Sequence, residues 1–95
     1  MPDPTPLLAA AERLADRFRA MPQSSLTRQA PAGLALARAM ARASGAEEEI
    51  PDAGVFVVGD QIAVAAHDLA LTLAATDTPE ADAVLAETLR AIAEL

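Results

Sequence analysis

Residues 54–75 read GVFVVGDQIAVAAHDLALTLAA, and this stretch decides the fold. Wound as an α-helix, it aligns one apolar stripe at spacings of three and four residues, formed by Val55, Val58, Ile62, Ala65, Ala66, Leu69 and Leu73. On the opposite side, Val57, Val64 and Leu71 recur every seven residues. A helix that is apolar on two sides usually packs on two sides. We therefore expect this segment to be the central helix of a small bundle, and its second apolar side could pack against a second subunit.

Three further segments have helical periodicity and recognisable ends. The first follows Thr5 as a cap and stops before Pro22, and the last follows Thr78 as a cap. The second ends at Gly45, and Pro31 inside it predicts either a kink or a separate first turn. The sequence therefore predicts an all-α bundle of four helices in one domain, residues 1–95, with helices at about 6–21, 24–44, 54–75 and 79–94.

The start of the central segment is ambiguous. Val55–Val58 consists of β-branched and aromatic residues between glycines, which is also the pattern of a short strand. The helical interpretation is preferred because these residues stay in register with Ile62 and Leu69. In a helix, Gly59 costs about 1 kcal/mol relative to alanine, so we expect another helix to cross closely there.

Composition limits the class of protein. A chain of 95 residues has a small core, so pairing with another copy would add to it. The absence of cysteine excludes disulfides and thiolate metal sites. The N-terminus lacks the basic start and apolar block of a secretory signal, and no apolar run approaches the roughly 20 residues that span a bilayer. We therefore expect a cytoplasmic protein that does not bind membranes.

Charge is divided unevenly along the chain. The net charge is −7; residues 1–45 carry six arginines and three acids, whereas residues 46–95 carry one arginine and eleven acids. An acidic chain is poorly suited to nucleic acid, which requires a basic surface. The division predicts attraction between the two halves: Arg38 and Arg42 share a helix face, and we expect at least one of them to pair with Asp60 or Asp68, within a subunit or across a dimer. The acidic run 47–49 is expected to be a solvated connector.

His67, beside Asp68 and near Asp60, belongs to the one cluster capable of acid–base chemistry. Adjacent residues diverge by about 100° on a helix, and the chain has no second histidine to assist. Two carboxylates about 12 Å apart along a helix do not share a metal ion. We therefore expect no catalytic residue, no metal and no cofactor, and place His67 at an interface with Val57, Val64 and Leu71, where its titration would make association pH-sensitive.

The expected function is that of a small non-enzymatic interaction or regulatory module, acting as a homodimer or through a protein partner. The alternative is a small-molecule or acyl-carrier role. Ser25-Leu26 at the head of the second helix resembles the Asp-Ser-Leu motif of acyl carrier proteins, in which the serine bears phosphopantetheine. The match covers one dipeptide, because the preceding aspartate is absent and the following helix is basic.

Overall fold

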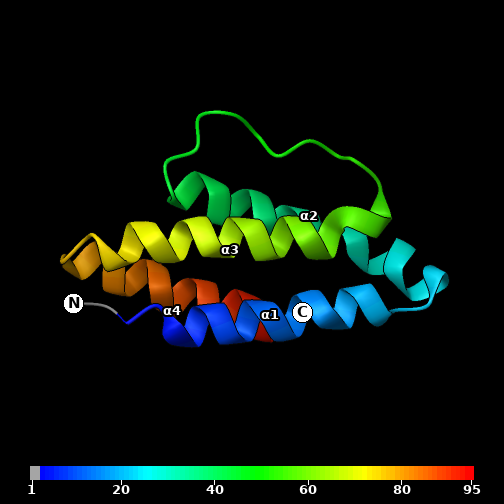
Figure 1. Ribbon diagram of the computed structural model, residues 1–95, viewed down its shortest axis with the longest axis horizontal. Helices are drawn as coiled ribbons and strands as arrows, with labels where there is room; N and C mark the ends of the chain where they lie inside the picture. The colour runs from blue at the N-terminus through cyan, green and yellow to red at the C-terminus, as the bar shows by residue number, and fades with distance from the viewer. Residues whose placement is uncertain (1–2) are drawn as a thin grey trace.

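Residues 3–95 fold into a bundle of four helices, which confirms the all-α prediction (Figure 1). A computed structural model describes residues 3–95, and within that range there is no β-strand. The helices are α1 (Thr5–Ala20), α2 (Gln23–Ala43), α3 (Val58–Ala74) and α4 (Pro79–Ala93). Their ends lie within a few residues of the predicted ones. A long connector, residues 44–54, joins α2 to the segment that leads into α3.

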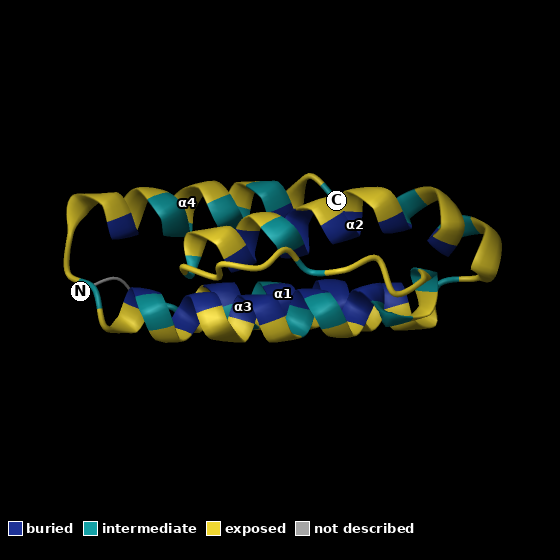
Figure 2. Cartoon of the chain, turned by 90° about the horizontal axis from the view of Figure 1, so that it is seen from above, coloured by how far each residue is buried: buried dark blue, intermediate teal, exposed yellow. Residues whose placement is uncertain are grey.

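The helices form two layers, as Figure 2 shows. Helices α1 and α3 run antiparallel side by side in one layer, while α2 and α4 lie in the other. Helix α3 packs most extensively, against both α1 and α2, whereas α4 makes fewer contacts, with α1 and α2. Most of the predicted stripe of α3 is buried in the core, beside Phe18 of α1 and Met40 of α2. The central position predicted for this helix is therefore correct.

The start of the central segment is helical, so the strand alternative for Val55–Val58 is wrong. Val55–Val57 forms a 3-10 turn, η1, that leads directly into α3. Gly54 precedes it with φ 97°, a conformation that suits glycine and turns the connector into the helix. A lone strand here would have no partner for its backbone hydrogen bonds, whereas the turn continues the register of α3.

Gly59 marks the predicted close crossing of a second helix. A Cβ atom on Gly59 would lie 3.0 Å from the carbonyl oxygen of Ala15 and 3.3 Å from Cγ of Arg19, both on α1. Helix α1 therefore crosses α3 closely at this point, and a larger residue would require the neighbouring atoms to shift.

The predicted helix ends at Pro22, Gly45 and Thr78 are confirmed, and the predicted cap at Thr5 is wrong. Thr78 caps α4, since its hydroxyl accepts a hydrogen bond from the Ala81 amide at 3.2 Å, and Gly45 follows α2 with φ 90°. Thr5, however, lies inside α1. Its amide donates instead to Oδ1 of Asp3 at 3.0 Å, and this hydrogen bond lowers the pKa of the Asp3 carboxyl.

Pro31 lies within α2, which nonetheless runs unbroken from Gln23 to Ala43. Proline has no N–H to donate to the carbonyl of Thr27, so one helical hydrogen bond is lost at this turn. Of the two predicted possibilities, the separate first turn is therefore excluded.

Val55–Ala74 is long and apolar enough to cross a membrane by length and composition alone, in contrast to the expectation that no run approaches that length. The segment reaches 20 residues because it includes only two charged side chains, Asp60 and Asp68. Its inner face is buried against α1 and α2, and the core helix of a bundle meets the same criterion.

Candidate functional site

The heptad-spaced residues Val57, Val64 and Leu71 form a seam along the outside of α3. Val64 is 62% exposed and Leu71 is 61% exposed, while Val57 is half-buried at the start of the helix. Phe56, in the turn before α3, is 71% exposed. Burial of such side chains would be favourable, by about 1.5–3 kcal/mol for each one fully covered. Whether a partner covers the seam stays a prediction.

A hollow of about 430 Å³ lies beside this seam. Its lining is mainly apolar and comes from α3, the preceding turn and the connector, through Ile50, Ala53, Val57, Asp60, Gln61 and Val64. Two hydrogen bonds hold the connector here: Arg38 Nε donates to the Ile50 carbonyl at 2.8 Å, and Gln61 Nε2 donates to the Pro51 carbonyl at 3.0 Å. The wall of the hollow is therefore fixed by the bundle itself.

The side-chain amide of Gln61 makes only part of its hydrogen bonds. Its Oε1 atom is buried and has no hydrogen-bond partner among the residues that the structure describes. A buried acceptor without a donor is unfavourable by about 1–3 kcal/mol.

Within one chain, neither Arg38 nor Arg42 pairs with Asp60 or Asp68, and the predicted pairing across a dimer stays a prediction. Arg38 and Arg42 both approach the same Glu49 carboxylate, with N–O distances of 3.6 and 3.9 Å. Asp60 pairs instead with Arg19 of α1, whose Nη2 and Nε atoms lie 2.7 and 2.9 Å from its Oδ1. The physical reason is proximity, because the connector folds back over α2 and places the Glu49 carboxylate beside both arginines.

The acidic run 47–49 is exposed and lies outside the helices, as predicted for a solvated connector. Glu49 forms ion pairs with Arg38 and Arg42 of α2, and these pairs were missed from the sequence because the path of the connector leaves no periodic signal. On α1, the hydrogen bond from Arg19 to Asp60 raises the pKa of Arg19; desolvation opposes this effect, and Asp16, 3.0 Å away, adds to it. Arg19, Arg38 and Arg42 therefore all pair with acids of residues 46–95, so the predicted attraction between the two halves is present, with Asp60 and Glu49 as the acids.

His67 and Asp68 are both exposed on the outside of α3, flanking Val64 and Leu71. Neither residue lines the hollow beside the seam. Within residues 3–95, no group of three histidine, cysteine or acidic side chains is placed to hold a metal ion.

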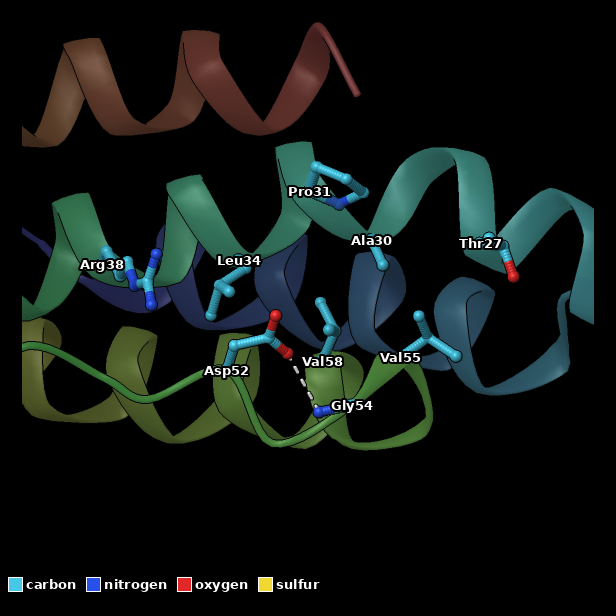
Figure 3. A pocket seen from close by; sticks show the side chains of 9 residues that line it. All are labelled: Thr27, Ala30, Pro31, Leu34, Arg38, Asp52, Gly54, Val55 and Val58. Carbon is cyan, nitrogen blue, oxygen red and sulfur yellow. Dashed lines mark hydrogen bonds between the residues drawn. The ribbon is translucent and has the colours of Figure 1, made fainter.

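A second hollow, of about 320 Å³, lies between α2 and the connector (Figure 3). Arg38 stands at one end of it, and the Asp52 carboxylate accepts a hydrogen bond from the Gly54 amide at 3.1 Å on the other wall. Leu34 and Val58 form an apolar floor between them. This hollow is at the lower end of the size range of small-molecule sites.

A third hollow, of about 250 Å³, separates α2 from α4 and is lined by residues such as Met40 and Val84. Ser25, in the first turn of α2, is half-buried, and its hydroxyl accepts a hydrogen bond from Nη2 of Arg28 at 3.3 Å.

No protein-family model matches this chain, and neither a curated protein nor a solved structure matches it. The candidate site therefore rests on its own geometry.

Proposed function

We propose that this chain is a non-enzymatic, cytoplasmic interaction module that forms a homodimer through the outer face of α3. The observation that carries the proposal is the exposure of Val64 and Leu71 at the centre of an otherwise well-packed helix. Helix α3 already buries its inner face against two neighbouring helices, and these outer side chains leave more than half of their surface exposed to water. In a dimer they would be removed from water.

The direct test is the mass of the protein in solution. We expect light scattering to report a dimer that dissociates on dilution. Replacing Val64→Glu should weaken association by about tenfold or more, because the lost burial of about 1.5–3 kcal/mol corresponds to at least one decade in the dissociation constant. Helical circular dichroism should stay unchanged, since Val64 is exposed within its own chain.

The matched control is Ala86→Glu, at an exposed position of α4. This variant adds the same charge away from the seam and should dimerise as the unaltered chain does. A monomer at every concentration for the unaltered protein would refute the proposal.

The small-molecule or acyl-carrier alternative is supported by the hollow of Figure 3 and by the position of Ser25. Its test is the intact mass of the protein purified from its native host. A gain of one phosphopantetheine group that is lost in Ser25→Ala would favour this alternative.

A further inference from the structure

The hollow of Figure 3 is elongated along α2. Its wall on this helix runs from Thr27 through Leu34 to Arg38, and the helix rises by about 16 Å over that span, at about 1.5 Å per residue. A volume of about 320 Å³ spread over this length suits a small, extended molecule and not a broad ring system.

Two opposite charges face the hollow toward the same end and do not pair with each other (Figure 3). Arg38 donates through Nε to the Ile50 carbonyl, and Glu49 approaches the same Nε atom at 3.6 Å. The two Nη groups of Arg38 donate no hydrogen bond within residues 3–95. Asp52 accepts one hydrogen bond, from the Gly54 amide, and forms no ion pair within the same range. Both side chains therefore keep hydrogen-bonding capacity for a ligand.

The rest of the hollow is mainly apolar. Leu34 and Val58 form its floor, and Pro31 extends the apolar lining away from the two charges. At the far end, the Thr27 hydroxyl already donates a hydrogen bond to the Gln23 carbonyl at 2.9 Å. A matching ligand therefore has its charged groups at one end and an apolar body at the other.

We propose that this hollow binds a free α-amino acid with an aliphatic side chain. The carboxylate of the amino acid accepts hydrogen bonds from the Nη groups of Arg38, and its ammonium donates to the Asp52 carboxylate. Its side chain lies over Leu34 and Val58. Arginine binds carboxylates in a bidentate manner, and hydrogen bonds between charged groups are the strong ones.

The two charges of the hollow select a zwitterion. A simple carboxylate at Arg38 meets the negative charge of Asp52, and a simple amine at Asp52 meets the positive charge of Arg38. An α-amino acid carries both charges close together and has no net charge, so it satisfies both residues at once. None of the seam residues Val57, Val64 and Leu71 lines this hollow, so the inference goes beyond the proposed dimer and does not depend on it.

The probe is L-leucine, titrated into the full chain while the amide chemical shifts are followed by nuclear magnetic resonance. We expect saturable shifts at the amides of Gly54, Val55 and Val58, which line the hollow. Leucinamide lacks the carboxylate, and isocaproate lacks the ammonium. Both should bind at least about tenfold more weakly, because a hydrogen bond to a charged group contributes about one decade or more to the dissociation constant. Glycine should also bind more weakly, because it has no side chain to bury.

Asp52→Asn separates the charge of this residue from its place in the fold. The amide oxygen still accepts the hydrogen bond from Gly54, while the negative charge is removed. Leucine should bind this variant at least about tenfold more weakly, whereas isocaproate should bind it equally or more tightly. Asp68→Asn, at an exposed position of α3 outside the hollow, is the matched control and should bind leucine as the unaltered chain does.

Three results would overturn the inference. The first is the absence of saturable shifts up to about 10 mM leucine, a concentration at which even a millimolar site is mostly filled. The second is a set of shifts that saturate along the seam and not in this hollow. The third is equal affinity for leucine and isocaproate, which would show that Asp52 binds no ammonium. Light scattering of the same samples reports the dimer separately, so these results leave the test of the proposed function independent.

Discussion

Gly33 of α2 packs against the ring of Phe18 on α1, and a Cβ atom on this glycine would lie 2.6 Å from Phe18 Cε2. The same Cβ would lie 2.8 Å from Cγ1 of Val58, at the start of α3. The glycine therefore lets three helices meet around one aromatic ring that is almost wholly buried. Glycine in a helix is unfavourable by about 1 kcal/mol relative to alanine. The close packing of α2 against Phe18 and Val58 offsets this cost.

We predict that Gly33→Ala destabilises the bundle by about 1–3 kcal/mol, the usual effect of overpacking a core. The better helix propensity of alanine offsets only part of this loss. Urea unfolding followed by circular dichroism measures it. Ala35→Ser, exposed on the same helix, should change stability by no more than about 0.5 kcal/mol. A more stable Gly33→Ala protein would show that Phe18 and Val58 move aside easily.

A second prediction concerns Pro31, which is exposed inside α2 and leaves the Thr27 carbonyl without its helical donor. Pro31→Ala restores an N–H at this turn, so the free energy of unfolding should rise by about 1–3 kcal/mol. Ala32→Gly, at the neighbouring exposed position, is the reference substitution and should lower the free energy of unfolding by about 1 kcal/mol. Loss of stability in Pro31→Ala would mean that the packing of α2 requires the distortion that proline imposes.

The third prediction concerns the connector. Arg38 is 29% exposed and donates to the Ile50 carbonyl, whereas Arg42 is mostly exposed and only approaches Glu49. Arg38→Ala should therefore speed amide hydrogen exchange in the connector while leaving the centres of the helices protected. Arg42→Ala is the matched control, because it removes the same charge without removing a hydrogen bond to the backbone. If both variants speed hydrogen exchange equally, the charge of the arginines holds the connector and the hydrogen bond from Arg38 adds nothing.

A fourth prediction follows from Asp3, whose pKa is lowered by the hydrogen bond from the Thr5 amide. A carboxyl with a depressed pKa in the folded state stabilises α1 above its unfolded value of about 3.9, and this contribution is lost as the pH falls through the lower folded value. The nuclear magnetic resonance titration of Asp3 should have its midpoint below 3.9. The first turn of α1 should loosen only at still lower pH, and a midpoint at or above 3.9 would contradict the bond.

The fold was predictable from local signals, and the site was predictable only in part. The stripe of α3, the cap at Thr78 and the crossing at Gly59 each depend on spacing or on a single residue type, which the sequence displays directly. The partners of Arg38 and Asp60 were not predictable in this way. They depend on how the connector crosses α2 and on which turn of α1 meets α3, and both follow from the packing of the whole chain.

The last prediction separates the stability of the chain from that of its dimer. A partner that binds only the folded state stabilises it by mass action, by about 2.7 kcal/mol at a concentration one hundred times the dissociation constant. In a chain of this size each kcal/mol corresponds to about 4–8 °C in the unfolding temperature, so Tm should rise by several degrees with protein concentration. Val64→Glu should have a Tm that does not depend on concentration and equals that of the dilute unaltered chain, because Val64 is 62% exposed within its own chain. Calorimetry of both proteins over a wide range of concentrations makes the comparison. A lower Tm for Val64→Glu at high dilution would show that this side chain supports the bundle itself, and a Tm of the unaltered chain that never changes with concentration would argue against self-association.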